Sequence, residues 1–105
     1  MTARIDPDEW RTPETEALIT ALLSLRTRDE AERFLRDLCT WREIDEMGRR
    51  WAVARRLDAG DPYRDIAEAT GASTATITRI NQWLQHGTGG YRLALSRFTG
   101  EDEPS

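Results

Sequence analysis

The sequence contains no lysine, a single cysteine and a single histidine. A lone cysteine, Cys39, cannot form an intrachain disulfide, and with His86 as the only histidine we expect no metal site. This cysteine usage favours a reducing, cytoplasmic location. The start of the chain is acidic where a secretory signal would be basic, and no apolar run is long enough to span a membrane. We therefore expect an intracellular protein without a membrane partner.

Charge is unevenly distributed along the chain. The net charge of −4 argues against a nucleic-acid partner, because contacts with phosphates supply most of the non-specific affinity. No acidic residue occurs between Glu68 and Glu101, however, whereas Arg79, Arg92 and Arg97 lie in that stretch. This local positive charge favours an anionic partner for the C-terminal part of the chain.

Apolar residues recur at helical spacing, and no segment alternates like a strand, so the fold class is predicted to be all-α with about six helices. Three helices are expected to begin after the N-cap residues of the stretches "TPE", "TRDE" and "TWRE", at Thr12, Thr27 and Thr40. Gly60 is expected to end the third. Three shorter helices are predicted over residues 63–69, 74–85 and 91–98.

We expect one helical domain over residues 12–98, preceded by an N-terminal extension at 1–11 and followed by a disordered tail at 99–105. The apolar faces of the first two helices are wide, and a chain of 105 residues offers little else to cover them. Dimerisation through the N-terminal half is therefore expected. The alternative is a compact monomeric bundle.

Residues 63–85 have the pattern of a helix-turn-helix. Ala67 is small where two helices must approach closely, and Gly71, four residues later, suits the left-handed backbone of the turn. Ile66, Ile77 and Ile80 supply the apolar contacts that fix the angle between the helices. An ordinary helical hairpin with a glycine turn is the alternative.

The second of these helices begins with small hydroxyl and methyl side chains. In a helix-turn-helix these residues meet base edges in the major groove, where threonine can present a methyl to thymine and a hydroxyl to a base or phosphate. Arg64 and Arg92 are predicted to contact the DNA backbone. The predicted DNA-binding residues are Arg64, Ser73, Thr74, Ala75, Thr76, Thr78, Arg79 and Arg92.

The stretch "GASTATITR", with "YRDIAEATG" before it and "GGYRLAL" after it, resembles the Trp repressor superfamily and its YerC/YecD branch. The resemblance extends from about Leu38 to Leu95. It implies an intertwined homodimer with a helix-turn-helix on each subunit. It also implies a sequence-specific transcriptional regulator, in particular a repressor, that binds double-stranded DNA at a palindromic operator.

The same resemblance implies an effector pocket formed by Thr40, Arg50 and Arg79, with Trp83 at a position where the Trp repressor has a serine. Because an indole would crowd that place, we expect that L-tryptophan is not the corepressor; the identity of any effector stays open, and no cofactor is expected. The alternatives are an ion pair between Arg50 and Glu46 and a phosphate contact for Arg79.

Two other functional classes are alternatives to a DNA-binding regulator. The fold could serve as a protein interaction module that docks a transcription partner, which the acidic N-terminal half would suit. An enzyme is not expected, because no nucleophile is paired with a base and no catalytic residues can be named. The segment "HGTGGY" lacks the lysine and hydroxyl residue of a phosphate-binding loop.

Overall fold

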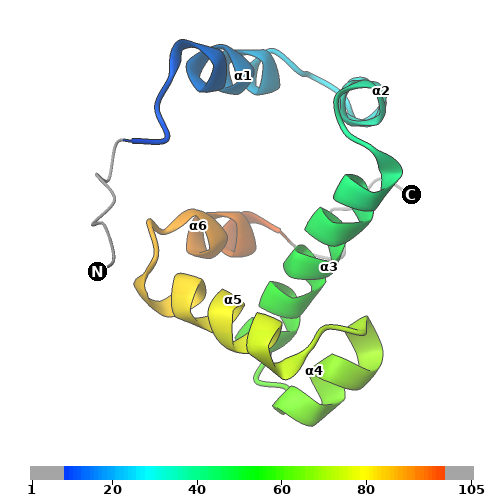
Figure 1. Cartoon of the computed structure of the whole chain (residues 1–105), viewed down its shortest axis with the longest axis vertical. Coiled ribbons are helices and arrows are strands. Elements are labelled where there is room, and N and C mark those ends of the chain that lie inside the picture. The colour runs from blue at the N-terminus through cyan, green and yellow to red at the C-terminus, as the bar shows by residue number, and fades with distance from the viewer. Residues whose placement is uncertain (1–8, 99–105) are drawn as a thin grey trace. The chain divides into compact units, whose positions relative to one another are not determined.

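The computed structural model describes residues 9–98, which form six helices (Figure 1). Within this range no strand occurs, so the all-α prediction is confirmed there. The predicted tail at 99–105 and residues 1–8 of the predicted extension lie outside the described residues. The helices are α1 Pro13–Leu23, α2 Arg28–Leu38, α3 Trp41–Asp58, α4 Tyr63–Thr70, α5 Thr74–His86 and α6 Gly90–Arg97.

The chain divides into two compact units, residues 1–41 and 42–105. In the first, α1 begins with a reciprocal cap. Thr12 Oγ1 accepts the N–H of Thr15 at 3.1 Å, and Thr15 Oγ1 accepts the N–H of Thr12 at 2.8 Å. Pro13 occupies the first helical position, where its missing N–H has no cost.

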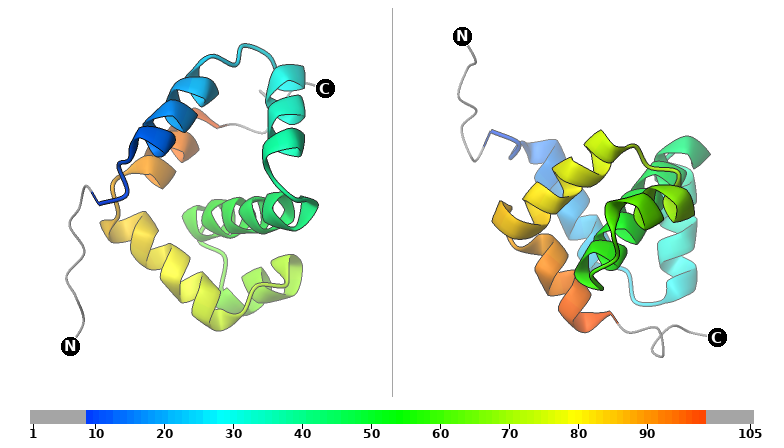
Figure 2. Two further views of the ribbon diagram at one scale, coloured as in Figure 1. Left: turned by 45° about the horizontal axis from the view of Figure 1, so that its top comes forward. Right: turned by 90° about the horizontal axis from the view of Figure 1, so that it is seen from below.

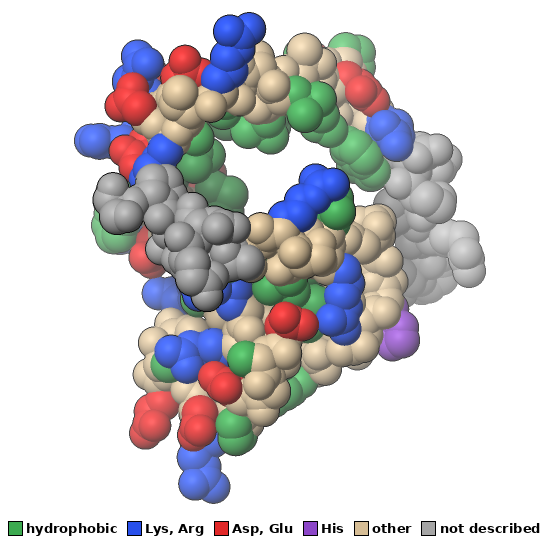
Figure 3. All heavy atoms as spheres, turned by 180° about the vertical axis from the view of Figure 1, so that it is seen from behind, with side chains coloured by type: hydrophobic (Ala, Val, Ile, Leu, Met, Phe, Trp, Pro, Cys, Tyr) green, Lys and Arg blue, Asp and Glu red, His purple; other side chains and the backbone are tan. Residues whose placement is uncertain are grey.

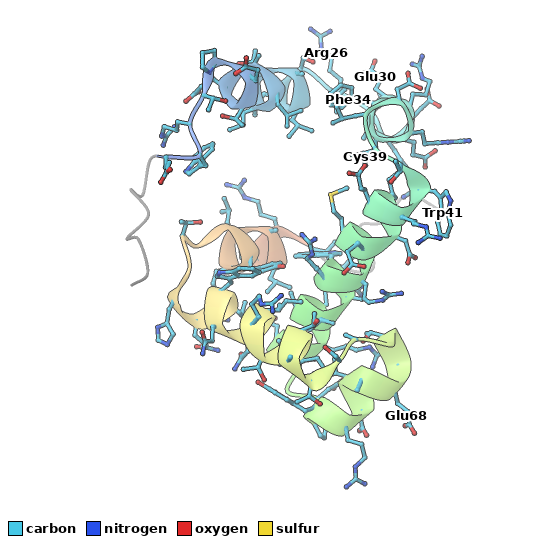
Figure 4. The ribbon with its side chains drawn as sticks, in the orientation of Figure 1. Arg26, Glu30, Phe34, Cys39, Trp41 and Glu68 are labelled. Atoms are coloured by element: carbon cyan, nitrogen blue, oxygen red, sulfur yellow. The ribbon has the colours of Figure 1, made fainter. Side chains whose placement is uncertain are left out.

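The cap of α2 differs from the predicted capping box in one bond. Thr27 Oγ1 accepts the N–H of Glu30 at 3.1 Å, as expected. The carboxylate of Glu30, however, accepts the N–H of Arg26 at 2.8 Å rather than that of Thr27. Figure 4 labels Arg26 and Glu30 at this start of α2. The pattern therefore predicted the helix start correctly, and the return bond is displaced by one residue.

Neither α1 nor α2 contains a buried residue. Large apolar side chains of α1 are exposed instead, and Leu23 is 81% exposed. The other exposed apolar residues of α1 are Leu18, Ile19 and Leu22. The apolar face of this helix is thus exposed among the residues that the structure describes.

A small core in the second unit is formed by residues of α3, α4, α5 and the turn between α4 and α5. Figure 2 shows the ribbons of these helices and of α6. Ile66, Ile77 and Ile80 are all buried in this core, as the helix-turn-helix pattern predicts. Val53 and Ala54 of α3 complete it, together with Ala72 of the turn. Trp51, Leu57, Ala67 and Tyr91 are partly buried against this cluster.

The helix α3 ends at a glycine in the left-handed conformation. Gly60 has a φ of 87°, and its N–H donates to the carbonyl of Leu57 at 3.0 Å. The N–H of Asp61 donates to the carbonyl of Arg56 at 3.0 Å. This pair of bonds is a Schellman motif, and it confirms Gly60 as the residue that ends the helix.

Candidate nucleic-acid interface

The segment between α4 and α5 is a short turn with a left-handed glycine. Gly71 has a φ of 75°, a conformation that other residues adopt only with strain. The hydroxyl of Thr70 donates to the carbonyl of Ile66 at 2.7 Å and accepts the N–H of Ala72 at 3.2 Å. With Ala72 buried beside Ile66, these bonds fix the turn, and α4 and α5 form a helix-turn-helix.

The start of α5 presents polar and small side chains to solvent. Ser73 Oγ accepts the N–H of Thr76 at 3.1 Å and so caps the helix, and it lies 3.0 Å from Thr76 Oγ1. Thr74, Ala75 and Thr78 are exposed. No acidic residue lies in the first turn of α5, which leaves its positive dipole end uncompensated.

One face of α5 is solvent-exposed along its length. At helical spacing Ala75, Thr78 and Arg79 lie opposite the buried Ile77 and Ile80, and all three are exposed. Gln82 lies on the same face and is also exposed. The sequence prediction missed Gln82, although its position four residues after Thr78 and seven after Ala75 was a sufficient signal.

The two arginines predicted to contact the DNA backbone have different surroundings. Arg64 lies on α4 and is exposed beside Asp65 and Glu68. In Figure 4 Glu68 projects away from α4, and Figure 3 shows acidic and basic side chains side by side over that helix. Arg92 on α6 instead forms an ion pair with Asp58, at 3.3 Å. Arg92 is thus already engaged in this structure.

Three of the four predicted effector residues come together. Arg50 of α3, with Arg79 and Trp83 of α5, lines a pocket of about 200 Å³, which Glu46, Thr76 and Ile80 complete. Thr40 belongs to the other unit of the chain. The Trp83 side chain is 51% exposed and also lines a neighbouring pocket with His86 and Tyr91.

The alternative prediction, an ion pair between Arg50 and Glu46, is not found in the structure. Glu46 forms its ion pair with Arg49, at 3.4 Å, and not with Arg50. Between residues 9 and 98, no ion pair joins Arg50 or Arg79. Burial raises the pKa of the Tyr91 hydroxyl, and the nearby charge of Arg50 acts in the opposite direction. Two arginines and one carboxylate line the pocket, so its lining carries a net positive charge.

The described residues contain no cluster of His, Cys, Asp or Glu that could hold a metal ion. In that range no helix is long and apolar enough to cross a membrane. The arrangement is that of a helix-turn-helix protein with an arginine-lined pocket between α3 and α5.

Comparison with known proteins identifies the family. The family model described as Trp repressor protein matches residues 13–99, so the chain belongs to the Trp repressor family. YerC of Bacillus subtilis (strain 168), whose function is uncharacterised, is 43% identical over 90 residues, which are 86% of each chain. This similarity places the chain in the YerC branch.

Two solved structures share the fold. A TrpR-like protein from Eubacterium eligens has 44% identity and a TM-score of 0.81, covering 86% of this chain and 93% of its own. A Trp repressor candidate from Staphylococcus aureus has 36% identity and a TM-score of 0.82, covering 90% and 94%. The predicted resemblance is therefore confirmed, and the chain has the fold of a family of regulators.

Proposed function

We propose that the chain is a sequence-specific DNA-binding transcriptional regulator that acts as a repressor. It binds a palindromic operator as a homodimer, without enzymatic activity. The observation that carries this proposal is the exposed face of α5, which offers Ala75 and Thr78 on a helix whose opposite side is held by Ile77 and Ile80. Small residues there permit the close approach that base contacts in the major groove require.

The proposed DNA contact of each residue is assigned from the exposure of its side chain and its hydrogen bonds within the protein. Thr74, Ala75 and Thr78 are exposed and are assigned to base edges. The hydroxyl of Ser73 caps the helix and is bonded to that of Thr76, so we assign both to phosphate contacts near the helix N-terminus. Gln82 joins the base contacts, because a glutamine can bond an adenine through two groups.

The cations supply affinity that does not depend on sequence. Arg64 and Arg79 are exposed and form no ion pair within residues 9–98. Arg92 can exchange Asp58 for a phosphate at little cost, because the pair is half-exposed and such surface pairs contribute about 0–1 kcal/mol. These contacts offset the net charge of −4 locally.

A homodimer is supported by the uncovered face of α1. Leu18, Ile19 and Leu22 are exposed there, and no residue of α1 is buried. A second copy of the chain would remove this apolar surface from water, as in other symmetric assemblies. A dimer would also present two recognition helices to the two halves of an operator.

The proposal is tested by selecting binding sites from random DNA with the full chain. We expect a palindromic consensus with half-site centres about 34 Å apart or a multiple of that spacing. Ala75→Asp places a carboxylate in the groove at a helix position that favours acids, so it should abolish operator binding without unfolding the protein. Ala75→Asn, of the same size but neutral, is the matched control and should retain affinity for non-specific DNA.

The selection can also contradict the proposal. If no sequence is enriched, and if Ala75→Asp and Ala75→Asn bind DNA equally, then α5 is not the recognition helix. The protein interaction module would then be the better explanation of the fold.

A further inference from the structure

We propose that Arg49 is a positioning residue that fixes the helix-turn-helix against α3, an inference that rests on the proposed function. Arg49 Nε donates a hydrogen bond of 3.0 Å to the backbone carbonyl of Thr70. The bond is partly buried and joins residues 21 positions apart. It connects the middle of α3 directly to the last residue of α4, next to the turn.

The carbonyl of Thr70 needs a partner from outside its own helix. The last carbonyls of a helix have no intrahelical donor, and they carry the negative end of the helix dipole. The last turn of α4 contains no basic residue of its own. Arg49 therefore supplies from α3 both the donor and the positive charge that the end of α4 lacks.

Two hydrogen bonds made by Thr70, one through its carbonyl and one through its hydroxyl, link Arg49 to the residue before the recognition helix. Arg49 binds the carbonyl of Thr70, and the Thr70 hydroxyl accepts the N–H of Ala72 at 3.2 Å. Ala72 is buried and directly precedes Ser73, the N-cap of α5. The position of Arg49 thus determines where the first turn of α5 begins relative to α3.

Arg49 is itself held in place by the preceding turn of α3. Its Nη2 lies 3.3 Å from Asp45 Oδ2, and its Nη1 lies 3.4 Å from Glu46 Oε1. Only 37% of the Arg49 side chain is exposed. The planar guanidinium contacts all three acceptors at once, which holds the Nε–H directed at Thr70.

The decisive comparison uses two neutral variants, Arg49→Gln and Arg49→Met. The glutamine amide nitrogen stands where Arg49 Nε stands and retains an N–H donor, whereas methionine has a similar length and no donor. We expect amide hydrogen exchange at Ala72 to be at least tenfold faster in Arg49→Met and near the wild-type rate in Arg49→Gln. Affinity for the selected operator should fall more in Arg49→Met than in Arg49→Gln, and affinity for non-specific DNA should change less.

Two controls separate this bond from charge and from the ion pairs. Arg56→Met makes the same charge change on α3 at a residue paired with Asp61, and it should leave Ala72 exchange unchanged. The double variant Asp45→Asn with Glu46→Gln removes both ion pairs of Arg49 and keeps its donor. Wild-type exchange at Ala72 is expected there as well, because the donor to the carbonyl of Thr70 is kept.

Equal exchange rates in Arg49→Gln and Arg49→Met would overturn the proposal, as would loss of protection in the double variant. Both measurements are made without DNA. If the wild-type chain binds no DNA, the proposed function fails, while the exchange rates still decide whether Arg49 holds the turn.

Discussion

Among single residues, Arg50 is notable because its charge affects both a pocket and a tyrosine hydroxyl. It lines the pocket that contains Arg79 and Trp83, and it also lies near the hydroxyl of Tyr91. Tyr91 stacks on Trp51 with ring centres 6.4 Å apart. The ionisation of Tyr91 therefore reports on both the packing of this aromatic cluster and the charge of the pocket.

We predict a raised pKa for Tyr91, measured by tyrosinate absorbance. The chain has two tyrosines, so in Tyr63→Phe the signal comes from Tyr91 alone. Its midpoint should lie above the ordinary tyrosine value of about 10, because burial disfavours the phenolate. Adding Arg50→Met should raise the midpoint further, since the cation that lowers the pKa is gone.

The same shift makes stability depend on alkaline pH. Above the ordinary tyrosine pKa the unfolded chain loses its phenolic proton while the folded chain keeps it, so the free energy of unfolding falls as pH rises. Replacing Tyr91 with phenylalanine should reduce this loss. A midpoint at or below that of a model peptide, or a decrease on adding Arg50→Met, would contradict the assignment.

At the scale of elements, the turn of the helix-turn-helix depends on its glycine. Gly71→Ala should destabilise the protein by roughly 1–2 kcal/mol, because alanine is strained in the left-handed region. Apart from Gly71 and its two chain neighbours, no atom of the described residues lies within 4 Å of the added methyl, so the loss comes from the backbone alone. Thermal unfolding measures it.

Gly48 in α3 is the matched control for this substitution. It also has no atom within 4 Å of an added methyl, but its φ is not positive. Gly48→Ala should therefore stabilise the protein by roughly 0.5–1 kcal/mol, since glycine weakens a helix interior. If both alanine variants change the stability in the same direction, the left-handed conformation of Gly71 is not the cause of the change.

The sequence was sufficient where structure depends on neighbouring residues. Caps at Thr12 and Thr27 and the glycines at 60 and 71 determine helix ends locally, and each was predictable from type and spacing. In α3, helical spacing puts Ile44, Met47, Trp51, Ala54 and Leu57 on one side of the helix. Only Ala54 among these is fully buried, together with Val53, because the packing of α4 and α5 selects the face.

The residues of the candidate site were predictable, but their contacts with residues distant in sequence were not. Arg50, Arg79 and Trp83 were grouped by resemblance, and they do line one pocket. The partners of the arginines were not predictable, because Arg92 with Asp58 and Arg49 with Thr70 are pairs distant in sequence. Only the packed helices bring such groups within hydrogen-bond distance.

At the scale of the whole molecule, we predict that stability depends on protein concentration. If two copies cover the apolar face of α1, dissociation is coupled to unfolding and the melting temperature rises with concentration. Leu22→Glu should shift sedimentation toward the monomer, because it places a charge in that face. Thr20→Glu adds the same charge on the polar side of α1 and should not. A folded monomer of the wild-type chain at low micromolar concentration would contradict the dimer.

The final prediction concerns coupling between the pocket and DNA binding. Arg50 and Arg79 provide the charge for an anionic effector, but the Trp83 indole lines the same pocket of about 200 Å³ and offers one donor and no acceptor. We therefore expect that L-tryptophan does not act as corepressor and that the recognition helix is positioned without it. Dialysed protein should bind its selected operator equally well with and without millimolar L-tryptophan, and calorimetry should show no saturable heat.

Trp83→Ser provides the matched comparison, because it removes the indole and supplies a hydroxyl that can both donate and accept. Operator binding by this variant without ligand should stay near the wild-type value, since Trp83 lies outside the contacts proposed for DNA. A tenfold gain in operator affinity of the wild-type chain on adding L-tryptophan corresponds to about 1.4 kcal/mol of coupling. Such a gain would show that the indole of Trp83 leaves the pocket open and that binding is conditional on the amino acid.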